Sequence, residues 1–163
     1  MKFFVFTTSL LVWIGLLLGV VSFAGTTDTV TATVTAANIS VRVEDGTVAY
    51  GTLATSGTAN TATLSQTQSA GNDGNATADL DAQGANSTNW TLGSAIGSET
   101  FTHEISTDGG TLYDKLNNAS YIGMKASQSA ATTQTFDLKI TVPSSTVFFG
   151  QQSATVTIQA SAI

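Results

Sequence analysis

This sequence has no cysteine, one proline and one histidine among its 163 residues. Without cysteine the protein forms no disulfide, offers no thiolate ligand to a metal ion and has no thiol nucleophile. With His103 as the single imidazole, one chain cannot build the usual zinc sites that contain histidine. These absences predict a protein without a metal ion or a cofactor, whose fold depends on its packed core.

Basic side chains are also scarce, with five Lys and Arg residues against eleven Asp and Glu residues. Nucleic-acid binding needs clustered Lys and Arg side chains that neutralise phosphates, and docking on anionic lipid needs basic clusters as well. The charges are scattered singly, so the sequence has no acidic tail or charged block. Neither a nucleic acid nor an anionic membrane surface is therefore expected as a partner.

The beginning of the chain has the pattern of a secretory signal peptide. Lys2 provides a positive charge, Leu10–Val21 is an uninterrupted apolar run, and Ser22–Ala24 offers small residues for a cleavage site. The run is shorter than the roughly 20 residues that cross a bilayer, which favours cleavage over a retained anchor. We expect a signal peptide over residues 1–24 and an exported single domain over residues 25–163, with a formal net charge of −7 and no membrane contact after cleavage.

Threonine and serine are abundant, with 29 and 17 residues, alongside 15 glycines. Thr is β-branched and suits a pleated, half-solvated surface, whereas Lys and Glu, which are common on helix surfaces, are almost missing. A Ser/Thr-rich disordered stalk has a similar composition, but stalks lack regularly spaced aliphatic residues. Such residues recur nearly throughout this chain, so the composition predicts an all-β protein.

Alternation of apolar and polar residues predicts strands along most of the sequence. In Phe136–Val142 the apolar residues are expected to face inward, and Asp137 and Lys139 to face outward. Thr29–Ala36 alternates in the same way, and a phase shift at Asn38 indicates either one long strand with a β-bulge or two strands with a short break. The other predicted strands are Val48–Leu53, Ala62–Ala70, Ala76–Ala82, Trp90–Leu92, Phe101–Ile105, Tyr121–Met124 and Ala154–Ala160.

Turn signals separate these segments at Asp45-Gly46, Gly71–Asn75 and Ser106–Gly110. Leu112–Asn118 has the only helix-like spacing and is expected to form one helical turn. About eight to ten short strands, with turns about every eight to twelve residues, predict a two-sheet β-sandwich. Closure into a barrel has no specific support.

Two segments resemble the immunoglobulin-like modules of bacterial and archaeal surface proteins. Val48–Leu53 is similar to their aromatic-Gly-Thr-aliphatic strand, and Asn72–Asn75 is similar to their Asn-x-Gly turn one hairpin later. The resemblance covers about Ile39–Leu92. It implies an immunoglobulin-like, antiparallel two-sheet sandwich in a surface protein.

Two further resemblances concern function. Trp90-Thr91-Leu92 resembles the first signature of the WxL cell-wall-binding domain, although Thr155–Ile163 lacks the second Trp motif of that family. A signal peptide followed by a Thr/Val-rich N-terminal strand is similar in general plan to TasA-like and archaeal bundling-pilus subunits. That resemblance implies an extracellular fibre in which this strand completes the sheet of the next subunit.

The N-terminal segment Asp28–Ala37 is the first candidate site. Val30, Ala32, Val34 and Ala36 lie on one face of it, and threonines cover most of the other. An extended segment at a free terminus can pair with an exposed sheet edge of a neighbour. The alternative is an ordinary first strand that pairs within its own domain, and both interpretations stay open.

The polar candidates have structural explanations. His103 alternates in phase with apolar neighbours and no nucleophile motif accompanies it, which favours a structural histidine and a protein that is not an enzyme. Asp79, Asp81 and Asp108 offer hard oxygen ligands for Ca²⁺, but no EF-hand spacing is present. Asp residues in turns usually bind their own backbone, so no metal site is predicted.

Five of the eight asparagines lie in Asn-x-Ser/Thr sequons, which are candidates for glycosylation if the source glycosylates exported proteins. These residues are Asn38, Asn75, Asn86, Asn89 and Asn118. Trp90, Tyr113 and Tyr121 are candidates to stack on sugar rings, although Trp and Tyr in a sandwich usually belong to the core.

The sequence therefore predicts a non-enzymatic, exported structural protein of the cell surface or extracellular matrix. The more specific hypothesis is a fibre or pilus subunit that assembles with other copies of itself by N-terminal strand addition. The alternative is a carbohydrate- or cell-wall-binding module that uses Trp90 to recognise a surface polysaccharide.

Overall fold

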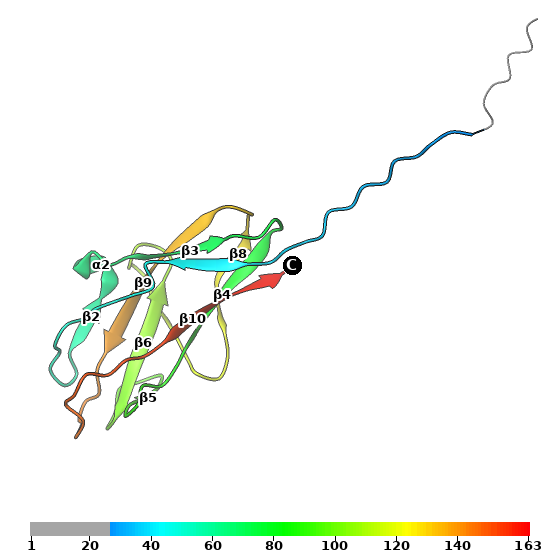
Figure 1. Ribbon diagram of the computed structural model, residues 1–163. Coiled ribbons are helices and arrows are strands. Elements are labelled where there is room, and N and C mark those ends of the chain that lie inside the picture. The colour runs from blue at the N-terminus through cyan, green and yellow to red at the C-terminus, as the bar shows by residue number, and fades with distance from the viewer. Residues whose placement is uncertain (1–26) are drawn as a thin grey trace, which may run out of the picture. The chain divides into compact units, whose positions relative to one another are not determined.

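The structure, a computed structural model, describes residues 27–163. The chain divides into two units, residues 1–35 and residues 36–163. The described part of the first unit contains no helix or strand, and every described strand belongs to the second (Figure 1). The predicted signal peptide over residues 1–24 lies outside the described residues.

Ten strands and one short helix are present in the described residues. The strands of the first sheet are β1 (Val41–Glu44), β2 (Thr58–Asn60), β3 (Gln68–Asn72), β5 (Thr91–Leu92), β6 (Thr100–Ser106), β7 (Asp114–Lys115) and β9 (Thr133–Thr141). The strands of the second sheet are β4 (Ala78–Gly84), β8 (Ile122–Gln128) and β10 (Val156–Ala162), and the helix is α2 (Thr61–Leu64).

The two sheets form the predicted all-β sandwich, which confirms the fold class. The first sheet has the order β1-β3-β9-β6-β5, with β2 added to β9 and β7 added to β6. The second sheet has the order β10-β4-β8. All pairs are antiparallel except β5 with β6, which is parallel and departs from the antiparallel expectation. The edge strands β1 and β10 therefore end the two sheets without a further partner in the described part of the chain.

Burial follows the predicted alternation in β4, whereas in β6 every residue from Phe101 to Ser106 is buried. Ala78, Leu80 and Ala82 of β4 are fully buried, and Phe101 and Ile105 of β6 are nearly so. The predicted strand Phe136–Val142 corresponds to β9, whose inward residues pack in the same cluster. A side-chain period of two places alternate residues on one face of a sheet, which is why this pattern could be predicted.

The predicted strand Ala62–Ala70 is wrong in its first half, which is helical, whereas its last residues belong to β3. Asn60 caps α2 by accepting a hydrogen bond from the Thr63 N–H at 2.9 Å, and Ser65 ends the helix in the left-handed region with φ 56°. The hydroxyl of Thr61, which is completely buried, donates to Asp137 at 2.9 Å and accepts from the Leu138 N–H at 2.8 Å. This buried threonine fixes the helical turn onto β9.

The predicted helical turn over Leu112–Asn118 is also wrong. The Leu116 N–H, which a helix would direct at the carbonyl of Leu112, donates instead to the His103 carbonyl at 2.9 Å. Asp114 and Lys115 form β7 beside β6, Leu116 is buried, and Leu112 is left largely exposed. The backbone N–H and C=O groups of this segment are therefore satisfied by hydrogen bonds to the neighbouring strand β6 and not by bonds within a helical turn.

Asp137 was expected on a solvated face, but it is only 2% exposed. Its Oδ1 accepts hydrogen bonds from the hydroxyls of Thr61 at 2.9 Å and Thr67 at 2.6 Å. Lys139, which was expected to face outward as well, pairs with Glu104 and lies 4.4 Å above the ring of Tyr113. The outer face of β9 is therefore covered by a small polar cluster.

Thr29–Ala36 forms no strand in the structure, and strand pairing begins only at Val41. Val30 and Val34 are each 96% exposed. A strand without a partner leaves its backbone groups and its apolar face in water, so it has no regular structure to adopt alone. The single strand bent at Asn38 is not observed in the described residues, and of the two separate strands only the second is present, as β1.

Candidate functional site

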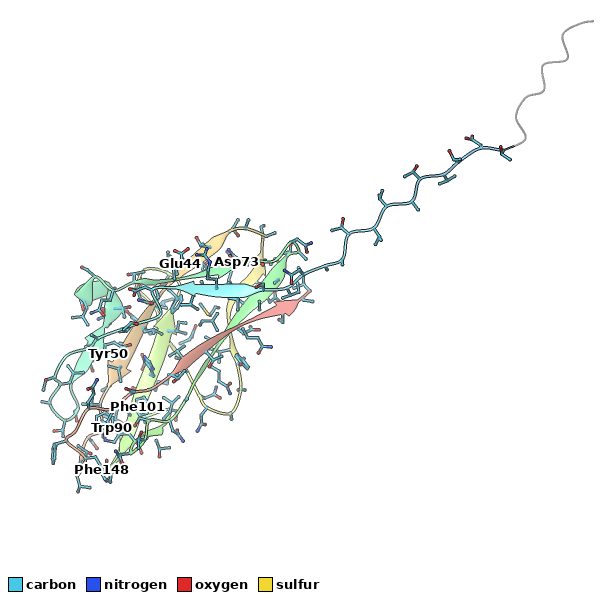
Figure 2. The ribbon with its side chains drawn as sticks, viewed as in Figure 1. Glu44, Tyr50, Asp73, Trp90, Phe101 and Phe148 are labelled. Carbon is cyan, nitrogen blue, oxygen red and sulfur yellow. The ribbon has the colours of Figure 1, made fainter. Side chains whose placement is uncertain are left out.

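A groove of about 1070 Å³ opens between the edges of the two sheets. One wall consists of β10 with the loop before it, and the other consists of Val43 and the segment Gly46–Thr55. The core-facing side of β9 forms the floor. We call this feature the edge groove. Figure 2 labels three of its lining residues, Tyr50, Trp90 and Phe148, of which the last two lie close together at one end of the domain.

The first wall is a strand with one free edge. Each of the seven residues of β10, from Val156 to Ala162, is paired with β4, and no described strand pairs with its other side. Val156, Ile158 and Ala160 pack against the core cluster but are only partly buried. A free edge presents unpaired backbone N–H and C=O groups, and here the apolar residues beside that edge are also incompletely covered.

The second wall has the composition of a strand but is not one. The predicted strand Val48–Leu53 is therefore wrong, and a reason lies in the backbone just before it and within it. Asp45 and Gly46 have φ of 69° and 68°, and Gly51 has φ of 75°, values that interrupt an extended strand. The segment crosses the edge of the first sheet without backbone pairing to β3.

Two glutamine side chains replace the missing strand partner of this wall. Gln66 accepts from the Ala49 N–H at 2.7 Å and donates to the Ala49 carbonyl at 3.0 Å. Gln68, which is buried, accepts from the Gly46 N–H at 3.0 Å. Side-chain amides carry both a donor and an acceptor, so they can satisfy a backbone peptide as a neighbouring strand does.

The groove is uncharged, and its floor is apolar. Its floor contains Phe136, Leu138 and Ile140, and none of its lining residues is an Asp, Glu, Lys or Arg. An occupant with a charged side chain toward the floor would lose its hydration without a partner, which is costly. The chemistry of the groove therefore favours an uncharged, apolar occupant.

The one titratable pair in the groove is buried and neutral. The hydroxyl of Tyr50 lies 2.8 Å from Nε2 of His103, and the two rings meet edge to face with centroids 5.9 Å apart. Burial lowers the pKa of His103 to about 4, and burial followed by the proximity of Tyr113 raises the pKa of Tyr50. Nδ1 of His103 has no hydrogen-bond partner among the described residues, so the imidazole fixes Tyr50 through one nitrogen only.

The mouth of the groove is the end where β10 begins. Phe148 and Phe149 are 41% and 82% exposed there, and Trp90 is half-buried beside them. Nε1 of Trp90 donates to the Thr146 hydroxyl at 3.0 Å, and its ring packs on Phe101 at a centroid distance of 6.3 Å. Trp90 thus packs against the core and also supports the loop at the mouth.

The segment before β1 is anchored to the turn that connects β3 to β4. The Asn38 N–H donates to Oδ1 of Asn75 at 2.7 Å, and the Asn75 N–H donates to the Asn38 carbonyl at 3.0 Å. Nδ2 of Asn75 donates to the Ala36 carbonyl at 2.9 Å. Of the predicted strand-addition residues, Ala36 therefore lies at this anchor, and Val30, Ala32 and Val34 precede it as exposed residues.

The three acidic residues considered as Ca²⁺ ligands are not brought together. Asp79 and Asp81 lie in β4, where Oδ1 of Asp79 accepts from the Ser127 N–H at 2.7 Å. Asp108 lies in the turn after β6, and hydrogen bonds from the Ser106 hydroxyl and the Leu112 N–H hold its pKa below the usual range. No cluster of three or more His, Cys, Asp or Glu side chains suited to a metal ion occurs in residues 27–163.

The five sequon asparagines are all exposed and gather at two places on the domain. One pair is the anchor described above, and in the other Nδ2 of Asn118 donates to Oδ1 of Asn86 at 3.1 Å. Asn89 lies beside Gln152 of the mouth loop. Their glycosylation stays a prediction.

Comparison with protein-family models, with curated proteins and with solved structures finds no match to this chain. In residues 27–163 no helix combines the length and apolar character that crossing a membrane requires.

Sequence reasoning missed most of the groove. It placed Tyr50 in a strand and His103 on a buried face, but nothing in the sequence indicated that they bond. It also missed Gln66, Gln68 and the loop that carries Phe148 and Phe149. Two adjacent phenylalanines after the strand-ending Pro143 are the signal that could have indicated an apolar surface there.

Proposed function

We propose that this protein is an exported, non-enzymatic structural subunit of cell-surface or extracellular fibres whose copies join by strand addition. Residues Asp28–Ala37 of one copy occupy the edge groove of another copy and pair with the free edge of its β10. The observation that carries the proposal is that one chain has both an open apolar groove and an exposed segment with a matching pattern.

The first support is the apolar face of the segment. Val30 and Val34 are each 96% exposed, and Ala32 and Ala36 continue the same face. Full burial of a valine side chain stabilises a complex by about 1.5–3 kcal/mol, so the two valines supply a substantial driving force. The small alanines allow the backbone between them to approach the floor closely.

The second support is charge. Thr29–Ala37 contains no charged residue, and the groove has no Asp, Glu, Lys or Arg in its lining. Asp28, the first residue of the segment, carries its only charge and has to reach water beyond the groove. The other nine residues enter the uncharged groove without desolvating an ion. Threonines on the opposite face of the segment remain in water.

The third support is length. The seven residues of β10 span roughly 23 Å, and the ten residues of Asp28–Ala37 span roughly 33 Å when extended. The segment is therefore more than long enough to pair with the part of β10 that lines the groove, Val156–Ile158, and to connect two domains.

The experiment compares two charge substitutions in the same segment of the full chain, purified after export. Val34→Asp puts a carboxylate on the face that enters the groove, whereas Thr33→Asp puts it on the face that stays in water. We expect filaments in negative stain for the unchanged chain and for Thr33→Asp, and their loss for Val34→Asp with an unchanged melting temperature. Filaments that persist in Val34→Asp, or an unchanged chain that stays monomeric at all concentrations, would contradict the proposal.

A further inference from the structure

The two ends of the sandwich differ, and the pairing registers define them. Val41, the first residue of β1, lies opposite Asn72, and Ala162, the last residue of β10, lies opposite Ala78. Both partners lie at the ends of the turn that connects β3 in the first sheet to β4 in the second, so β1 begins where β10 ends (Figure 1). We call this the exit end, because the anchored residues Ala36–Asn38 leave the domain there.

The mouth lies at the opposite end of β10. Val156, the first residue of β10, lies opposite Gly84, the last residue of β4. The exposed Phe148 and Phe149 come just before it in the chain. At the exit end, by contrast, β1 contacts β10, which narrows the space between the two sheet edges. A segment from another molecule therefore finds the groove accessible at the mouth.

Resting on the proposed function, we infer that the segment of one copy enters the next copy through the mouth and lies antiparallel to its β10. In this arrangement Ala36 stays near the mouth and Val30 lies deep in the groove, toward the exit end. β10 runs from the mouth to the exit end, so a segment whose N-terminus lies deepest runs against it. Antiparallel pairing is also slightly more stable per residue than parallel pairing.

Two alternative arrangements give the opposite direction. If the segment folded back into the groove of its own copy, it would have to reverse just before β1, and Val30 would lie at the mouth. If two copies exchanged segments through their exit ends, they would form a closed dimer, and Val30 would again lie at the mouth. In both cases the segment would run parallel to β10.

The antiparallel arrangement has a consequence for the assembly. Each copy donates from its exit end and accepts at its mouth, so the contact joins two different surfaces. A contact of this kind that does not close into a ring produces an open filament. The direction of the segment therefore decides between a linear fibre, a closed dimer and a self-closed monomer.

Pairs of introduced cysteines test this direction, since the chain has none of its own. Val30→Cys with Ala160→Cys, and Ala36→Cys with Ala154→Cys, report the antiparallel arrangement. Val30→Cys with Ala154→Cys reports the parallel one. Residues 154 and 160 lie roughly 20 Å apart along the strand, so a thiol cross-linker shorter than half that distance separates the cases.

We expect each of the first two pairs to give a ladder of cross-linked bands at multiples of the chain mass on a denaturing gel. The third pair should give no such ladder. Filaments under reducing conditions for each variant show that the substitutions leave assembly intact. If filaments form and only the third pair gives cross-linked bands, the segment runs parallel to β10. That result would contradict the antiparallel direction but not strand addition. A cross-linked monomer with the third pair would show self-closure and contradict both. No filaments and no cross-link with any pair would contradict the proposed function itself.

Discussion

The hydroxyl of Tyr50 and Nε2 of His103 lie 2.8 Å apart in the edge groove, and their contact joins its second wall to β6. Tyr50 belongs to the irregular segment Gly46–Thr55, whereas His103 belongs to β6 in the middle of the first sheet. This hydrogen bond connects the second wall, which has no strand pairing, to a paired strand of the first sheet. It also makes the groove sensitive to the protonation of one imidazole.

Acidification is expected to destabilise the domain through His103. Burial lowers its pKa from 6.5 to about 4, so between these two pH values the unfolded chain binds a proton that the folded chain does not. The free energy of unfolding therefore falls as the pH drops through this window, by about 3 kcal/mol in total, because one pKa unit corresponds to about 1.4 kcal/mol. Below pH 4 both states carry the proton and this contribution stays lost.

Urea unfolding at pH 7, 6 and 5 measures this dependence. Carboxylates titrate mostly below pH 5, so the slope above that value reports the imidazole. His103→Gln keeps a hydrogen-bonding side chain but removes the titration, and we expect a flat profile between pH 7 and 5. An equal slope in that variant would show that another group is responsible.

Gln66→Ala is expected to loosen the second wall of the groove. The substitution removes both hydrogen bonds to Ala49 and leaves its peptide group without a protein partner. The loss of each bond corresponds to about 0.5–1.5 kcal/mol, so hydrogen exchange in Thr47–Thr52 should accelerate several-fold. Mass spectrometry of exchanged peptides measures the effect, and Gln159→Ala on exposed β10 surface serves as the matched control.

Asp137→Ala is expected to lower the free energy of unfolding by about 2–3 kcal/mol. The buried carboxylate accepts hydrogen bonds from Thr61 and Thr67, and its removal leaves both hydroxyls without that acceptor. Asp81→Ala, in β4 and less buried, should change the stability by less than about 0.5 kcal/mol. Denaturant unfolding of the two variants tests this contrast, and equal losses would contradict the role given to the cluster around α2.

Val34→Ala is expected to raise the critical concentration for filament formation about tenfold. The change removes two methyl groups from the face that enters the groove, and each buried carbon corresponds to about 0.8 kcal/mol. Thr33→Ala should leave the critical concentration within about twofold, because Thr33 faces water in the complex. Sedimentation of the polymer over a concentration series measures both values, and a larger effect at Thr33 would reverse the assignment of faces.

The alternation of apolar and polar residues along the sequence was enough to predict the all-β sandwich and the inward residues of β4, β6 and β9. Adjacent residues of a strand point to opposite faces, so burial on one face leaves a period of two in the sequence. The lack of cysteine and the scarcity of basic residues likewise follow from the chain alone. The pattern of Asp28–Ala37 suggested a terminal segment that could pair with another copy.

Only the tertiary structure decided which segments pair and which edge stays free. Val48–Leu53 has a strand pattern, yet it does not pair with β3. Positive φ angles interrupt its backbone, and two glutamine side chains form hydrogen bonds with this part of the chain instead. Ala62–Ala70 begins with a helical turn because buried Thr61 bonds across to β9, a partner more than 70 residues away. The edge groove arises where the edges of two sheets, formed by segments far apart in the sequence, face each other without a strand between them. A local sequence pattern cannot show that such an edge stays unpaired.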